Sequence, residues 1–131
     1  MSFALFVPTA IGAGAALAIG NAIADIERDR ASSVGSVVVA LGPIAAWRLH
    51  AVLLVGVFSV ALASLAIYRP AGSLDPRWSV LIVGIGGLIA GIGAVLARSP
   101  RADRRERGWE LEAVGVGLGA IGWIGGLGGP G

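Results

Sequence analysis

The chain of 131 residues contains no cysteine and no lysine, and it has a single histidine, His50. The absence of cysteine excludes disulfides, thiolate metal sites and thiol catalysis together. A lone histidine without cysteine or carboxylate partners makes a poor metal site, so we expect neither a metal nor another cofactor. All ten basic residues are arginine, and the formal net charge is only +2. This balance provides no basic patch suited to nucleic acid, and no nucleic-acid partner is expected.

Charged side chains are also scarce, and they are confined to short stretches. They make up 14% of the residues, whereas 56% are hydrophobic; a soluble domain has roughly 25% charged residues. Four apolar runs contain no Asp, Glu, Arg or His. The runs occupy residues 3–24, 51–68, 78–97 and 113–127. The first run is about 33 Å long as a helix at ~1.5 Å per residue, enough to cross a hydrocarbon core of ~30 Å.

These runs predict an all-α fold, because backbone polar groups in lipid must be satisfied within the segment that crosses it. The sequence is therefore typical of a polytopic integral membrane protein, with one domain built as a four-helix transmembrane bundle. Residues 31–42 are apolar but short, and we expect an interfacial or re-entrant piece there. A helix should begin near Pro43, since proline suits the first turn of a helix, and should cross the membrane from about residue 51. The alternative is a fifth span over residues 31–47.

Arginine is distributed unequally between the connections, which predicts an orientation. With four spans, connections 25–50 and 98–112 hold eight arginines on one side, against two in 69–77. The positive-inside rule then places the loop at 98–107 on the inner side of the membrane, and five spans give the same placement. We expect the cytoplasmic membrane of a prokaryote, or an envelope derived from it.

The second of these arginine-rich connections has two interpretations. Ser99 and Pro100 predict the start of a helix that runs to about Glu112. We expect residues 98–112 to be polar on all sides and too charged to be buried. Four of their arginines are predicted to contact anionic lipid headgroups or an acidic partner. The four are Arg101, Arg104, Arg105 and Arg107. The alternative is that they serve only as an orientation signal.

Small residues recur at helical spacing within the runs, which predicts faces for close helix packing. The predicted packing residues are Gly84, Gly87, Gly91, Gly115, Gly119, Gly122 and Gly126. The second run carries a similar stripe, made of Gly56, Ser59, Ala63 and Ala66. Such faces favour association with other membrane subunits or with copies of the same chain.

Candidates for chemistry are few. Asn21, near the end of the first run, is predicted either to line a polar path or to be satisfied near the interface. We interpret His50 as an interfacial residue. An enzyme acting on lipid would have to bring Asp25, Glu27 and His50 together. The sequence therefore favours a non-enzymatic structural or assembly role, as a subunit of a membrane complex or a membrane-lining matrix protein of an enveloped particle. The alternative is a small oligomeric channel or transporter.

Overall fold

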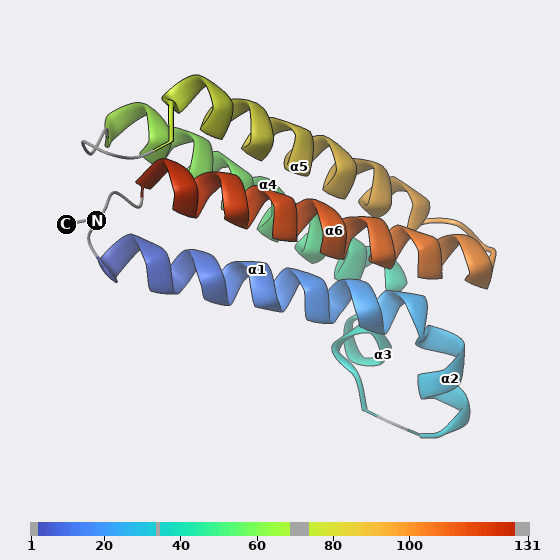
Figure 1. Ribbon diagram of the computed structural model, residues 1–131. Coiled ribbons are helices and arrows are strands. Elements are labelled where there is room, and N and C mark those ends of the chain that lie inside the picture. Colours follow the sequence, from blue (N-terminus) through green and yellow to red (C-terminus); the bar gives the residue numbers. More distant parts are fainter. Residues whose placement is uncertain (1–2, 34, 69–73, 128–131) are drawn as a thin grey trace.

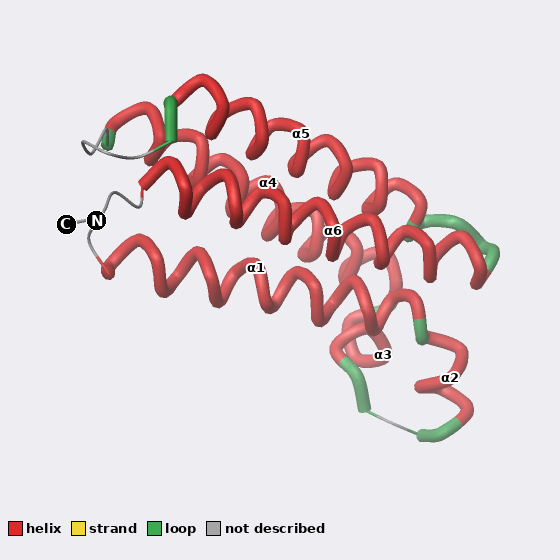
Figure 2. The backbone as a smooth tube through the Cα atoms, in the orientation of Figure 1, coloured by secondary structure: helices red, strands yellow, loops and turns green. Residues whose placement is uncertain are grey.

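Four long helices dominate the computed structural model, which describes residues 3–33, 35–68 and 74–127. They are α1 (Phe3–Ala24), α4 (Pro43–Ile67), α5 (Pro76–Leu96) and α6 (Ala102–Leu127). They lie side by side as an elongated bundle (Figure 1). Each is long and apolar enough to cross a membrane, and the described ranges contain no strand (Figure 2). The prediction of an all-α, four-helix membrane bundle is confirmed.

Two short helices follow α1 and precede α4 in the sequence. They lie at one end of the bundle (Figure 1). They are α2 (Ile26–Ala31) and α3 (Val37–Leu41). Gly42 separates α3 from α4 with a φ of 79°, a conformation that glycine adopts without steric cost, and Pro43 begins α4 as predicted. The alternative of a fifth span is wrong, because α3 has only five residues and spans about 8 Å.

Helix α6 is central, and it contacts α1, α4 and α5. Its contact with α5 is the most extensive in the bundle, and small residues make it possible. A Cβ atom added to Gly86 of α5 would lie 2.6 Å from the Gly115 carbonyl oxygen, and one added to Gly115 would lie 2.5 Å from the Ala90 nitrogen. The two backbones therefore touch, and any larger side chain at these glycines would force them apart.

The polar and apolar halves of α6 form one continuous helix, but the burial of its polar half differs from the prediction for residues 98–112. Most charged side chains of that segment are exposed, but Arg105 is only 6% exposed and Glu112 is fully buried. The expectation that the segment is too charged to be buried is therefore wrong. The physical reason is that another helix supplies a partner for each buried side chain. The acidic Glu27 contacts Arg105, and the basic side chain of His50 contacts Glu112.

The outer faces of the four long helices are apolar, and they suit contact with lipid. Large hydrophobic side chains such as Ile11, Val52, Leu88 and Ile121 are each about two-thirds exposed. At the end of the bundle opposite α2 and α3, Trp123 donates a hydrogen bond from its indole nitrogen to the Ser64 hydroxyl at 2.6 Å. In the predicted 69–77 connection, residues 69–73 lie outside the described part of the chain.

Candidate functional site

The most deeply buried ionisable side chains are His50 of α4 and Glu112 of α6, which are both 0% exposed and lie opposite one another. His50 Nε2 is 3.0 Å from Glu112 Oε2, the separation of an ion pair, although the angles are not those of a hydrogen bond. His50 lies about 10 Å along α4 from its first residue, and Glu112 about 15 Å along α6, at ~1.5 Å per residue. His50 is therefore buried among the helices, and its predicted level at the membrane interface stays a prediction.

The hydrogen bond on the other side of the imidazole determines which nitrogen carries a proton. His50 Nδ1 lies 2.8 Å from the Ala16 carbonyl oxygen. A carbonyl oxygen only accepts hydrogen bonds, so Nδ1 must be the donor and must carry a proton. Nε2 then faces the carboxyl group of Glu112.

Two glycines make room for this pair at the point where all four long helices meet. A Cβ atom on Gly20 of α1 would lie 2.5 Å from Glu112 Oε2 and 3.1 Å from His50 Cε1. A Cβ atom on Gly93 of α5 would lie 2.6 Å from Glu112 Cγ. Both helices therefore approach the pair with bare backbone, because even alanine would overlap the carboxyl side chain.

The surroundings of the pair do not fully satisfy its polar atoms. Within the described part of the chain, Glu112 Oε1 and the neighbouring Trp109 Nε1 are buried and have no hydrogen-bond partner. Toward the middle of the bundle the next layer is apolar and consists of Ala16, Leu54 and Ala94. Each unpaired buried polar group costs about 1–3 kcal/mol. Ionisable residues inside a membrane are therefore rare, and they usually mark a functional site.

Asn21, the predicted polar path, is exposed and lines a small cavity of about 170 Å³. Trp109 belongs to the same cavity, and its Cδ1 atom would lie 3.5 Å from a Cβ on Gly20. Glu112 is not among the residues that line the cavity. Trp109, which lines the cavity, precedes Glu112 on α6 by three residues, or about one helical turn.

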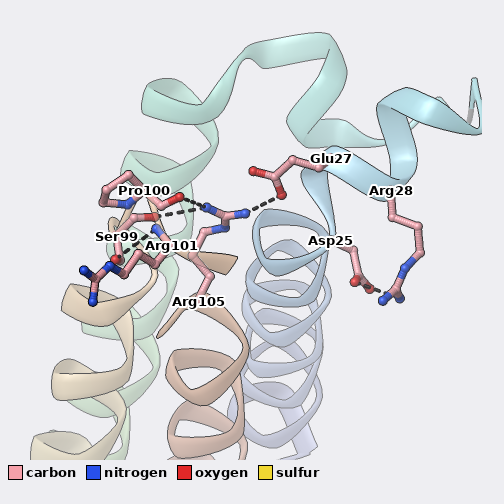
Figure 3. A network of polar contacts seen from close by, with 7 residues as sticks. All are labelled: Asp25, Glu27, Arg28, Ser99, Pro100, Arg101 and Arg105. Atoms are coloured by element: carbon pink, nitrogen blue, oxygen red, sulfur yellow. Dashed lines mark hydrogen bonds and ion pairs between the residues drawn. The ribbon is translucent and has the colours of Figure 1, made fainter. Parts of the chain in front are cut away.

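The three residues that an enzyme would need to combine are instead paired separately. Asp25 forms an ion pair with Arg28 at 2.9 Å. Glu27 forms one with Arg105, and His50 faces Glu112. Figure 3 shows the Asp25–Arg28 pair beside α2, away from the Glu27–Arg105 contact.

Arg105 is the one member of the predicted arginine cluster that is buried. Its guanidinium donates hydrogen bonds to the carbonyl oxygens of Ser99 and Pro100, both at 3.1 Å, and reaches Glu27 on its other side (Figure 3). Arg101, Arg104 and Arg107 are exposed.

The structure divides the predicted packing glycines into two groups. Gly115, Gly119, Gly122 and Gly126 are all buried against other helices, and Gly87 lies against the Phe58 ring. Gly84 and Gly91 are exposed and have nothing within 4 Å of an added Cβ. Helix α5 packs on α6 through a different face, made of Gly86, Ala90 and Gly93.

Sequence reasoning missed Glu112, although a signal for it existed. When the stripe of packing glycines on α6 is continued toward the helix start at the same spacing, it passes through Glu112, Gly108 and Arg105, which are all buried. A carboxylate on the packing face of a helix requires a buried partner, and His50 was the remaining candidate inside an expected helix. Comparisons with protein-family models, curated proteins and solved structures found no match to this chain.

Proposed function

We propose that the protein is a non-enzymatic, small multi-pass membrane protein with a structural or assembly role. It would be a subunit of a membrane complex, or a membrane-lining matrix protein of an enveloped particle. The observation that carries this proposal is the small-residue stripe on α4. Its four members are Gly56, Ser59, Ala63 and Ala66, and all four are exposed. The expected absence of ionisable residues from the spans no longer supports the proposal, because His50 and Glu112 lie inside helices α4 and α6.

An exposed stripe of this kind favours helix association in a membrane. Lipid gives no hydrophobic drive for helices to pair, so pairing depends on close backbone contact along small residues. An added Cβ on Gly56 meets nothing within 4 Å, and Gly84 and Gly91 of the neighbouring α5 face open space as well. The chain therefore presents surfaces that a helix of another copy or another subunit can approach closely.

The arginine distribution supports the orientation that belongs to this proposal. We place the end of the bundle that carries α2, α3 and the α5–α6 turn on the inner side of a prokaryotic cytoplasmic membrane, or of an envelope derived from it. Arg101, Arg104 and Arg107 are exposed there, which suits contact with anionic headgroups or an acidic partner.

A matched pair of substitutions tests the assembly role. Gly56→Leu fills the stripe on α4, whereas Gly117→Leu adds the same bulk to an exposed position of α6 that also has nothing within 4 Å. Gly117 is flanked on its face by the large residues Val114 and Ile121. Self-association is measured in liposomes by energy transfer between labelled copies. We expect Gly56→Leu to abolish the transfer and Gly117→Leu to preserve it. Equal transfer for both variants, or none for the wild type with no co-purifying subunit, rejects the proposal.

The buried pair favours a second candidate function, a small oligomeric channel or transporter that moves protons. An imidazole and a carboxyl group can each accept and release a proton, and here they lie 3.0 Å apart, with the Asn21 cavity at the arginine-rich end of the bundle nearby. The test is acidification of proteoliposomes that contain a pH-sensitive dye, with Glu112→Gln as the inactive variant. Wild-type flux that Glu112→Gln removes supports transport. Flux equal to that of empty liposomes rejects it.

A further inference from the structure

A second cavity, larger than the one at Asn21, lies at the same end of the bundle and is lined by arginine. This arginine cleft has a volume of about 550 Å³ and lies between α2, the start of α4 and the turn from α5 to α6. Its lining includes four arginines and a single carboxylate. The five charged residues are Glu27, Arg30, Arg48, Arg98 and Arg105.

The positive charge of the cleft is not balanced within the protein. Glu27 is already paired with Arg105. Arg30, Arg48 and Arg98 have no carboxylate within 4 Å in the described part of the chain. Arg105 adds a donor, because its Nε is buried and has no hydrogen-bond partner among the described residues. Such a concentration of guanidinium groups attracts an anion with oxygen atoms that accept paired hydrogen bonds.

Two of the arginines that line the cleft are held in position by contacts within the protein. Arg98 lies over the ring of Trp47, with 4.7 Å from its Cζ atom to the ring centroid. The Trp47 indole nitrogen in turn donates a hydrogen bond to the Ala94 carbonyl oxygen at 2.8 Å. Arg105 is fixed by its bonds to the α5–α6 turn. An anion would therefore meet guanidinium groups that are already oriented, which lowers the entropy cost of binding.

Much of the remaining lining of the cleft is apolar, which points to a lipid as the source of the anion. Ile23, Ile26, Pro43 and Ile44 belong to the lining, and Ile44 is 69% exposed. Tryptophan and arginine together are typical of the level of the headgroups in a membrane. The phosphodiester of a phospholipid matches the arginines of the lining, and its glycerol and the first part of an acyl chain match the isoleucines.

From these observations we infer that the arginine cleft binds the phosphate of an anionic phospholipid headgroup, at a defined site formed by Arg48, Arg98 and Arg105. This site differs from the exposed cluster of Arg101, Arg104 and Arg107, of which none lines the cleft. The inference requires the membrane location but neither of the two functions proposed above.

Two double variants with equal loss of charge test the site. Arg48→Gln with Arg98→Gln empties the cleft of two guanidinium groups, and Arg101→Gln with Arg107→Gln removes two exposed ones outside it. Binding of phosphatidylglycerol to the detergent-solubilised full chain is measured by native mass spectrometry, with phosphatidylcholine of the same acyl chains as the neutral comparison. We expect about 30-fold weaker phosphatidylglycerol binding for the cleft variant, which corresponds to about 1 kcal/mol per arginine, and less than threefold for the exposed variant.

Three other results would contradict a lipid-binding site in the cleft. Equal weakening in both variants means diffuse attraction by net charge and overturns the inference. Equal binding of the two lipids by the wild type overturns it as well. Displacement of phosphatidylglycerol by millimolar inorganic phosphate identifies a free anion, and not a lipid, as the occupant. Circular dichroism of both variants checks that helix content is unchanged, and Arg98→Lys, which keeps the charge without the planar fork, should recover only part of the binding.

Discussion

Removing the carboxyl group of Glu112 is the most direct test of the buried pair. Glu112→Ala leaves His50 fully buried, with Nδ1 bound to the Ala16 carbonyl and Nε2 without a partner. Breaking a buried pair by deleting one partner costs about 3–5 kcal/mol. The matched control is Glu110→Ala, two residues away on the same helix, where the side chain is exposed. We expect the control to change stability by less than about 0.5 kcal/mol.

Two further variants separate the contributions to this loss. In a neutral imidazole the proton on Nδ1 leaves Nε2 free to accept a hydrogen bond. The amide of Glu112→Gln can donate that bond, so we expect the free energy of unfolding to fall by only about 1 kcal/mol. Replacing both partners, as His50→Leu with Glu112→Met, removes both buried ionisable groups. Replacement of a buried pair by apolar groups of similar size is often neutral or stabilising, so this double variant should be more stable than Glu112→Ala.

The assay is unfolding in mixed micelles by titration with sodium dodecyl sulfate, followed by circular dichroism. The free energy of unfolding is compared among the four variants and the wild type. The reasoning is refuted if Glu112→Ala is as stable as Glu110→Ala, because a carboxyl group in contact with a buried imidazole cannot be removed without cost. It is also refuted if Glu112→Gln loses as much as Glu112→Ala, since the proposed proton on Nδ1 would then be misplaced.

Three other substitutions follow from the packing. Gly20→Ala should destabilise the bundle by about 1–3 kcal/mol, because its Cβ would overlap the Glu112 carboxyl group; Gly14→Ala, in open space on the same helix, is the control in the same unfolding titration. Gly115→Leu should prevent α5 and α6 from packing together. The measurements are loss of the gel band of the folded protein and cleavage by protease at the α5–α6 turn. Trp123→Phe should cost about 1 kcal/mol through loss of its hydrogen bond to Ser64, measured by the same titration, with Trp78→Phe on the exposed surface as control.

The number of membrane helices followed from the sequence because it depends on length and polarity alone. Four runs without ionisable residues determine four helices that lipid can accept. The start of α4 was also predictable, since Gly42 can adopt a positive φ and Pro43 cannot continue an earlier helix. The burial of two charged side chains on α6 was not predictable, because it depends on the tertiary partners that Arg105 and Glu112 find on other helices.

The buried pair was harder to predict, because it depends on how helices are rotated about their axes. The glycines of α5 illustrate the difficulty. Gly84 and Gly91 have helical spacing but face outward, while Gly86 and Gly93 have the same spacing and contact α6. Spacing therefore identifies faces that can pack, but it does not decide which of two such faces meets a neighbour within the chain.

The position of Glu112 explains why the least apolar of the four long helices is the most buried. A helix that carries charged residues can lie in a membrane only if they reach the headgroups or face inward. On α6 the exposed charges are grouped in its first turns, whereas Glu112 lies deeper, on the same face as the glycines that contact α5. Glycine thus has two roles. On α5 and α6 it brings the two backbones together, and at Gly93 of α5 and Gly20 of α1 it leaves the space that the Glu112 carboxyl group and the His50 imidazole occupy. The same lack of side chains that tightens the bundle allows an ionisable pair to lie between its four long helices.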